Sequence, residues 1–356
     1  MSEPSLCIKV KKIRGEKALV LASKLEISDR GLKIKQNTDN LYIPLIRQPT
    51  KNELVKLKAQ LPDFELATKV FTKKKPQGKT LQQVLENQLS PHLLDSLPRA
   101  LDVIGNIAVI EIPFELKAYK QIIGEALLKT HKNVRTVLAK IGAVTGTYRL
   151  REFELIAGEQ KTITIHKEHG CQYQVDVATA YFSPRLSHEH YRVATIVQKA
   201  ETVVDLFAGV GPFSVLIAKK NTDARVYAVD INPEAVVFLE KNIRLNRVDN
   251  RVISIQGNAR QVVEDQLLGF ADRVIMNLPE KASEFIDAAC KAIKPSGGIV
   301  HYYEFIRLPD TLEDAQQRFS EAVEKTGRKV DAFLFAKTIR ETAPYESQIV
   351  LDAKIL

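Results

Sequence analysis

The segment from Val203 to Ser214, VVDLFAGVGPFS, constrains the fold more than any other part of the chain. An apolar, β-branched run ends in Asp205, a glycine-containing turn follows, and an apolar stretch with helical character continues to about Lys220. This order predicts a buried strand, a tight turn and a helix, which together open a βαβ unit. Glycines in such a turn let the backbone approach a ligand that lies across the strand ends.

The turn differs from the dinucleotide-binding fingerprint, because Ser214 stands where the third glycine of Gly-x-Gly-x-x-Gly would be. Asp205 precedes the glycines, where a carboxylate suits an ammonium or a ribose better than a pyrophosphate. A second acid, Asp230, closes the next apolar run, about 20 positions after Gly209, the spacing at which doubly wound folds offer a carboxylate to a ribose. Together these features predict S-adenosylmethionine as the cofactor.

The composition limits the class of protein. The 356 residues, 45% hydrophobic and 27% charged, are typical of a folded chain of two or three domains. Three scattered cysteines without a Cys-x-x-Cys pair argue against a zinc site or a disulfide framework and fit a reducing compartment. No apolar run reaches membrane-spanning length and no signal-peptide pattern opens the chain. We therefore expect a cytoplasmic protein without metal or membrane partner, whose net charge of +9 suits a polyanion.

Changes of pattern along the chain predict three modules and one linker. Residues 1–66 are typical of a small α+β module, and residues 67–79, which are basic and broken by proline and glycine, indicate a linker. Its run 73–79 is equally compatible with a solvated loop and a phosphate contact. Residues 80–180 indicate mostly sheet with the Tyr, Arg and Lys content of an RNA surface. Residues 181–356 alternate strands and helices, which predicts a mainly parallel sheet with ligands at its carboxyl edge.

Polar residues follow the expected strands of the last module and should meet at that edge. Asp230 and Ile231 follow the second strand, Asn258 and Ala259 the third, and Asn277 the fourth. Asp230 would accept hydrogen bonds from ribose hydroxyls. The amide oxygen of Asn258 would accept from the adenine amino group, while the N–H of Ala259 meets a ring nitrogen. An ordinary turn role for Asn258 fits the sequence equally well.

The segment from Asn277 to Glu280, NLPE, stands where methyltransferases of exocyclic amino groups carry Asp/Asn-Pro-Pro-aromatic. Glu280 replaces the aromatic residue that would stack on the target base, which argues against that chemistry. The segment also lacks a cysteine, so attack on pyrimidine carbon six is disfavoured.

Four motifs together resemble the archaeal and eukaryotic tRNA (guanine-N1)-methyltransferases that modify position 37, next to the anticodon. They are YRLRxxxLxAG at 148–158, DVxxxYFSPRLSHEH at 176–190, DLFAGVGPF at 205–213 and MNLP at 276–279. The resemblance covers essentially the whole chain. It implies a class I, Rossmann-like S-adenosylmethionine-dependent methyltransferase domain preceded by two small α+β RNA-binding domains. It also implies a monomer that contacts the outer corner and the anticodon stem-loop of tRNA.

The chemistry of this reaction needs a base and a cation. Methylation leaves guanine N1 neutral only if its proton departs, and a carboxylate near N1 can take that proton. Negative charge then moves onto O6, where a guanidinium would stabilise it. Glu189 and Arg149 match the family positions for these two catalytic tasks. Taken alone, Glu189 would be a solvated helix acid and Arg149 a phosphate contact.

The resemblance also assigns binding residues. His190 matches a position at which the family carries Arg or His beside the cofactor, whereas Asn258 departs from the acid frequent at its position, and Glu280 receives no role. The residues expected to bind substrate are Tyr181, Arg185, Arg151 and Pro279. Those expected to bind the cofactor are His190, Asp205, Phe207, Gly209, Gly211, Asp230, Ile231, Asn258, Ala259 and Asn277.

Three alternatives to methyl transfer onto guanosine 37 remain open. Relatives methylate the tricyclic wyosine-type base at position 37, in place of guanine or in addition to it, and another relative transfers the aminocarboxypropyl arm of the same cofactor. A tRNA-binding protein with an inactive cofactor domain is disfavoured, because the acids and glycines of the turn are intact.

Overall fold

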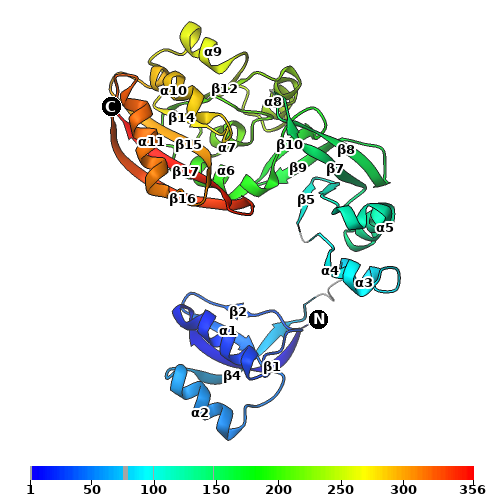
Figure 1. The fold of residues 1–356 in the computed structure, drawn as a ribbon. Helices are drawn as coiled ribbons and strands as arrows, with labels where there is room; N and C mark the ends of the chain where they lie inside the picture. The colour runs from blue at the N-terminus through cyan, green and yellow to red at the C-terminus, as the bar shows by residue number, and fades with distance from the viewer. Residues whose placement is uncertain (1, 75–78, 99, 147) are drawn as a thin grey trace. The chain divides into compact units, whose positions relative to one another are not determined.

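The chain folds into two compact units that divide between Lys79 and Thr80 (Figure 1). The computed structural model describes residues 2–74, 79–98, 100–146 and 148–356. Residues 75–78 of the expected linker lie outside this description. Across the described residues, no helix is both long and apolar enough to cross a membrane.

The first unit is a four-stranded antiparallel sheet in the order β2-β3-β1-β4, with two helices. Residues 67–72, expected in the linker, belong instead to strand β4. They pair with β1, and Phe71 is fully buried, so this part of the linker prediction is wrong. The elements are β1 (Ser2–Lys11), η1 (Lys12–Arg14), α1 (Gly15–Lys24), β2 (Lys35–Gln36), β3 (Asn40–Pro44), α2 (Lys51–Gln60) and β4 (Glu65–Thr72).

The second unit begins with a four-stranded sheet in the order β5-β6-β7-β8, covered by α5. Strands β5 and β6 form a hairpin, and its turn is made by Gly105, with φ of +56°, and Asn106. Positive φ explains the glycine. The elements are α3 (Leu81–Leu85), α4 (Pro91–Asp95), β5 (Leu101–Ile104), β6 (Ile107–Ile110), η2 (Phe114–Tyr119), α5 (Lys120–Thr130), β7 (Thr136–Thr145) and β8 (Leu150–Gly158).

The hairpin of β9 (Ile163–Glu168) and β10 (Cys171–Asp176) packs with the third module, although the sequence placed it in the second. Asn242 on α8 (Pro233–Leu245) accepts from the Gln174 N–H at 2.6 Å and donates to the Gln174 carbonyl at 3.0 Å. Tyr173 joins the core formed by the helices beside it. The boundary expected at 180/181 therefore falls too late in the chain.

The third module is a seven-stranded sheet in the order β13-β12-β11-β14-β15-β17-β16. Its first five strands are parallel, and β17 lies antiparallel between β15 and β16. This order confirms the predicted class I, Rossmann-like domain. The strands are β11 (Thr202–Asp205), β12 (Arg225–Asp230), β13 (Val252–Gln256), β14 (Arg273–Met276), β15 (Gly298–Arg307), β16 (Val330–Ala343) and β17 (Glu346–Ile355).

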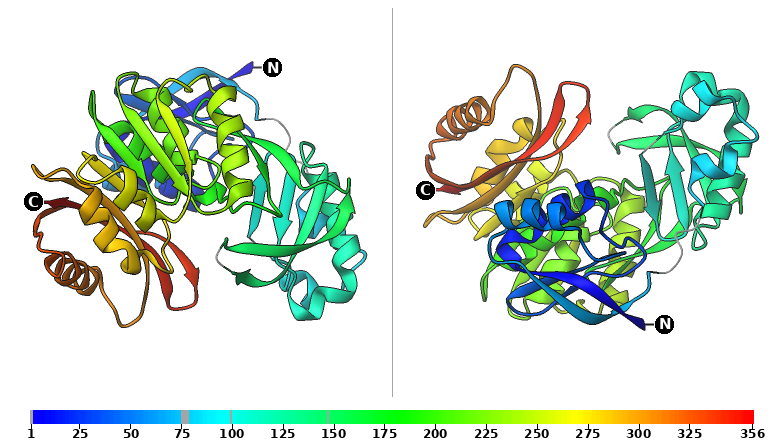
Figure 2. Two further views of the ribbon diagram at one scale, coloured as in Figure 1. Left: turned by 90° about the horizontal axis from the view of Figure 1, so that it is seen from above. Right: turned by 90° about the horizontal axis from the view of Figure 1, so that it is seen from below.

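Helices cover both faces of this sheet (Figure 2). Helices α6, α7 and α8 pack on one face and α9, α10 and α11 on the other. The strand order changes direction between β11 and β14, since successive strands are added on one side of β11 and then on the other. Open α/β sheets bind ligands at such a point. The remaining elements are η3 (Pro184–Leu186), α6 (Ser187–Ile196), α7 (Pro212–Lys220), α9 (Ala259–Gln266), η4 (Ala282–Phe285), α10 (Ile286–Ala292) and α11 (Leu312–Glu324).

Replacing Asn242 with alanine should destabilise this packing. The fully buried amide also donates to the Val210 carbonyl at 2.9 Å. Its loss therefore leaves three backbone groups without this partner: the Gln174 N–H, the Gln174 carbonyl and the Val210 carbonyl. We expect a loss of roughly 3 kcal/mol or more, since three backbone groups are left unsatisfied and each costs about 1–3 kcal/mol. The melting temperature should fall by about 5–10 °C, while the exposed Asn250→Ala should melt like the wild type. Equal melting temperatures for Asn242→Ala and the wild type would show that Asn242 does not stabilise the packing of the β9–β10 hairpin on α8.

Candidate active site

A cavity of about 210 Å³ opens at the carboxyl ends of the first four strands of the third module. The segments 206–209, 230–232, 257–259 and 277–278, which follow β11, β12, β13 and β14, contribute to its wall. The cavity therefore lies at the edge where the sequence predicted that polar residues would meet.

Asp230 ties two of these segments together. Its Oδ2 accepts from the Gly209 N–H at 2.6 Å, and its Oδ1 accepts from the Asn232 N–H at 2.9 Å. Burial raises the pKa of Asp230 above its usual range, against these stabilising hydrogen bonds. Each oxygen retains acceptor capacity toward the cavity, because a carboxylate oxygen can accept more than one hydrogen bond.

The two glycines of the turn serve different purposes. Gly209, with φ of +55°, lines the cavity. Gly211, with φ of +89°, lies behind it, and a Cβ there would meet Leu239 Cδ1 at 2.4 Å. Gly211 therefore acts through packing at the start of α7, where Pro212 is the first helical residue.

Asp205 is fully buried behind the cavity wall and was expected to bind the cofactor. Its Oδ2 accepts from Ser214 Oγ at 2.7 Å, so the residue that replaces the third glycine holds this acid. Oδ1 is buried and has no hydrogen-bond partner among the described residues. Burial, reinforced by the nearby Asp230, raises the pKa of Asp205 to about 7.

The polar groups that follow β13 and β14 differ in whether they already have a hydrogen-bond partner. The Asn258 Oδ1 accepts from the Arg260 N–H at 3.0 Å and caps α9, as the turn interpretation of this residue predicts. Ala259 is the first residue of α9, so its N–H has no acceptor within the helix. The Asn277 Oδ1 lines the same cavity and is buried without a partner among the described residues.

His190 lines the cavity from α6 and is 1% exposed. Its Nδ1 lies 2.7 Å from Glu168 Oε1 on β9. Although burial raises the pKa of Glu168, hydrogen bonds from His166 and His190 bring it down to about 2. Glu168 therefore stays ionised and orients the His190 ring. Sequence reasoning missed Glu168, since nothing in its local pattern marks it as the partner of a residue on a later helix.

A second cavity, of about 290 Å³, adjoins the first. Both are lined by Arg149, Tyr181, Phe182, Ser183 and Glu280. The second is lined by five cationic side chains, Lys140, Arg149, Arg151, Arg185 and Arg340, and by four carboxylates, Asp102, Glu280, Glu341 and Glu346.

Two of these cations show how the second cavity is built. Arg185 Nε donates to Asp102 Oδ1 at 2.5 Å, which joins the third module to β5. Burial lowers the pKa of Lys140, and the neighbouring Arg151 lowers it further. The expected substrate residues Arg151, Arg185 and Tyr181 therefore share one cavity. Pro279 does not line either cavity; it is buried, and its carbonyl accepts from Phe305 N–H at 3.4 Å.

Arg149 lies where the two cavities meet. Its guanidinium carbon stands 4.6 Å from the centroid of the Tyr181 ring, and its Nη2 donates to Glu280 Oε1 at 3.2 Å. Nε is buried without a partner among the described residues. The backbone of Arg149 has φ of +55°, a conformation that residues other than glycine rarely adopt. Glu280, for which the sequence suggested no role, thus holds the expected catalytic cation.

Glu189 does not line either cavity, although His190 beside it does. Its carboxylate accepts from Arg192 Nε at 3.0 Å and from the Tyr303 hydroxyl at 3.1 Å. Of the two expected catalytic residues, Arg149 therefore lines both cavities, whereas Glu189 lines neither and is paired with Arg192.

The buried state of Asp205 predicts a pH-dependent stability. Its pKa rises from the usual 3.8 to about 7 in the folded protein, so the folded state holds the proton longer than the unfolded state. The contribution of Asp205 to the stability of the wild type should therefore fall as pH rises from about 4 to about 7, by roughly 4 kcal/mol in all.

Asp205→Asn does not titrate, so its stability relative to the ligand-free wild type should improve between pH 5 and pH 8. Urea unfolding at both pH values measures this, with Asp223→Asn on the exposed surface as control. An unchanged difference between the two pH values would contradict the assignment.

Three family models match the chain. Residues 164–331 match the TRM5/TYW2 methyltransferase domain, residues 81–162 the TYW2 N-terminal domain, and residues 7–53 the tRNA methyltransferase 5 N-terminal domain. The first of these begins inside β9, in agreement with the packing of the β9–β10 hairpin on α8.

Known tRNA methyltransferases match between 78% and 99% of the chain. The tRNA (guanine(37)-N(1))-methyltransferase Trm5b of Pyrococcus abyssi is 39% identical over 99% of both chains. The tRNA 4-demethylwyosine(37)-methyltransferase Taw21 of Saccharolobus solfataricus is 32% identical over 78% of this chain and 99% of its own. A solved complex of aTrm5 and tRNALeu matches with a TM-score of 0.68 and 33% identity, over 99% of this chain and 100% of that one. The chain therefore belongs to the TRM5/TYW2 family of tRNA methyltransferases.

Proposed function

We propose that this protein transfers a methyl group from S-adenosylmethionine to N1 of guanosine 37 in tRNA. The observation that carries the proposal is the position of Arg149, at the junction of a cavity on the methyltransferase strand edge and a second cavity rich in cations. Similarity to guanosine-37 methyltransferases over nearly the full length supports it. In this proposal the first unit contacts the outer corner of the tRNA and the second unit its anticodon stem-loop.

The residues of the first cavity fit S-adenosylmethionine, the cofactor of this family. Asp230 has spare acceptor capacity for two ribose hydroxyls. The buried, unpartnered Asn277 Oδ1 suits an ammonium donor. Ala259 N–H suits a ring nitrogen, whereas the capping bond of Asn258 occupies one lone pair of the oxygen expected to meet the adenine amino group. When bound, the cofactor supplies an electrophilic methyl group on a sulfonium.

The second cavity suits a nucleotide of RNA. Its cations attract phosphate, and Tyr181 offers an aromatic face to a base. Arg149 is held by Tyr181 and Glu280 with an unused Nε–H. A guanidinium fixed in advance would stabilise charge developing on guanine O6 without reorganising at the moment of reaction.

Glu189 serves as the base in this proposal. It must turn from Arg192 toward the cavity, because its carboxylate faces away from the lining residues in the structure. Its neighbour His190 lines the cavity, so this turn of α6 lies at the cavity wall.

The direct test is methyl transfer to tRNA transcripts that differ only at position 37. With labelled cofactor we expect label in transcripts carrying guanosine there and none in those carrying adenosine. Mass spectrometry of the nucleosides should identify 1-methylguanosine. Label confined to tRNA that carries a wyosine-type base would instead favour the Taw21-like reaction, and a gain in mass of an aminocarboxypropyl group would favour arm transfer. Absence of any transfer would refute the proposal.

Two substitutions should separate catalysis from cofactor binding. Glu189→Gln should slow single-turnover methyl transfer by about 100-fold or more, typical of a lost general base, while cofactor affinity stays unchanged. Asp230→Ala should weaken cofactor binding by about 1–3 kcal/mol, since ribose hydroxyls lose their acceptor. Equilibrium titration and rapid-quench kinetics measure the two effects. Normal turnover in Glu189→Gln would exclude Glu189 as the base, and normal affinity in Asp230→Ala would exclude the ribose contact.

A further inference from the structure

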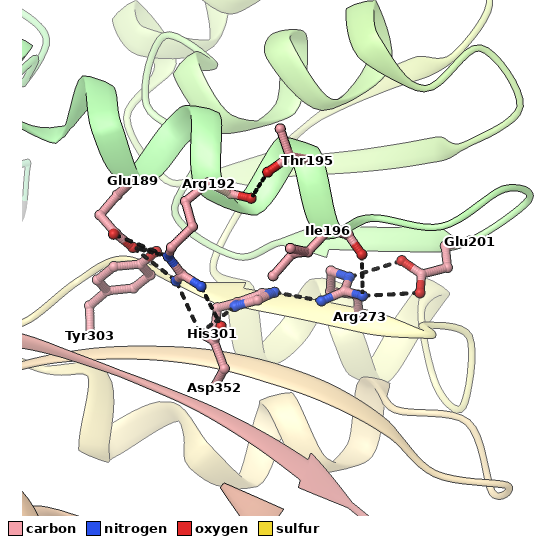
Figure 3. Close-up of polar contacts among 9 residues, drawn as sticks. All are labelled: Glu189, Arg192, Thr195, Ile196, Glu201, Arg273, His301, Tyr303 and Asp352. Atoms are coloured by element: carbon pink, nitrogen blue, oxygen red, sulfur yellow. Dashed lines mark hydrogen bonds and ion pairs between the residues drawn. The ribbon is translucent and has the colours of Figure 1, made fainter. Parts of the chain in front are cut away.

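A continuous polar network runs from Glu189 into the third module, between α6 and the sheet (Figure 3). Arg192 bridges Glu189 and Asp352, with Nη1 donating to Asp352 Oδ2 at 2.5 Å. His301 Nδ1 lies 2.6 Å from Asp352 Oδ1, and its Nε2 lies 2.8 Å from Arg273 Nη1. The network ends at Glu201, which accepts from Arg273 Nε at 2.9 Å and Nη2 at 3.0 Å.

The hydrogen bonds fix the protonation of His301. An arginine can only donate, so Arg273 must donate to His301 Nε2. The ring proton therefore resides on Nδ1 and is donated to Asp352, which leaves His301 neutral. Burial lowers the pKa of this fully buried histidine, in the same sense.

The charges of the network do not balance. It contains three carboxylates, those of Glu189, Asp352 and Glu201, but only two guanidiniums, those of Arg192 and Arg273. One negative charge is in surplus within a region shielded from water, where unpaired charge is costly.

Glu189 is the surplus carboxylate. Glu201 holds Arg273 with both oxygens. Asp352 receives hydrogen bonds from both Arg192 and His301. Burial raises the pKa of Asp352, but these two neighbours outweigh it and bring the pKa to about 2. Without Glu189, two guanidiniums face two carboxylates and the charges balance.

We propose that Asp352 is a positioning residue that frees Glu189 to act as the base. Because Arg192 keeps Asp352 as a counter-ion, Glu189 can turn to the cavity without leaving a buried guanidinium unpaired. The N1–H bond of guanine then breaks as the O–H bond of Glu189 forms. The electron pair left on N1 bonds the methyl carbon, whose former bonding pair stays on the sulfur. This inference rests on the proposed function.

The groups that face Glu189 come from three elements. Arg192 on α6 and Tyr303 on β15 contact Glu189 directly, whereas Asp352 on β17 and His301 on β15 reach it only through Arg192. Burial holds the pKa of Tyr303 well above its usual value, so this hydroxyl stays neutral and only donates. The charged groups nearest to Glu189 in the network are therefore Arg192, which contacts it, and Asp352, which contacts Arg192.

The test is the pH dependence of single-turnover methyl transfer to a tRNA transcript with guanosine at position 37. The acid limb of the rate profile should be lost in Glu189→Gln. Asp352→Asn removes a negative charge and should move the limb to lower pH by about one unit. It should also reduce the plateau rate about tenfold or more, because Arg192 would then be left without a carboxylate whenever Glu189 turns to the cavity. Arg192→Gln removes a positive charge and should move the limb to higher pH by about one unit.

Asp331→Asn is the matched control. Asp331 lies on β16 beside the same strand and pairs with Lys354 at 2.7 Å on the exposed surface. Its rate profile should match that of the wild type. Cofactor affinity, measured by equilibrium titration, should be equal in all the variants.

Limb shifts in opposite directions support the inference, since structural damage alone would lower rates without opposite shifts. Acid limbs of Asp352→Asn and Arg192→Gln that stay at the wild-type pH, or that both move in the same direction, overturn it. If Asp352→Asn does not fold, the upward shift in Arg192→Gln decides the question. Failure of the wild type to methylate guanosine 37 would refute the proposed function, whereas an active wild type with unmoved limbs in the variants would refute only the role of Asp352.

Discussion

The hydrogen bond from the Gly209 N–H to the Asp230 carboxylate is the contact on which the site depends. It joins the ends of two neighbouring parallel strands, and the same carboxylate also holds the Asn232 N–H at the start of α8. The first cavity forms around this junction. A glycine with positive φ is needed there because its N–H must point at the acid while the chain turns into the next helix.

The site of Arg149 is built from two modules. The second module contributes Arg149 itself, and the third, the methyltransferase domain, contributes the residues that hold its guanidinium. Arg149 follows β7, whereas Tyr181 and Glu280 belong to segments beside the sheet of the third module. Neither module could form this arrangement alone. Arg185 and Asp102 also join the two modules in the lining of the second cavity, with the cation supplied here by the third module.

The sequence was sufficient to predict the strand edge and most of its residues, because alternation of strands and helices is a local pattern. Gly209, Asp230, Ile231, Asn258, Ala259 and Asn277 all line the first cavity. His190 and Phe207 line it too, but they were expected from the family resemblance and not from the alternation of elements. Contacts between distant segments were beyond this reasoning. Glu280 meets Arg149 across 131 positions, and Asp352 meets Arg192 across 160. The β9–β10 hairpin has the same pattern whichever module it joins, so its partner α8 could not be identified from the chain alone.

The left-handed backbone of Arg149 has a consequence for engineering this enzyme. Holding a residue with a Cβ in this conformation costs about 1–2 kcal/mol, whereas glycine adopts it without that cost. A search for thermostable variants that scores only the folded backbone would therefore select glycine at position 149. It would discard the guanidinium that the rest of the pocket is built to hold, so stability and activity compete at this single residue.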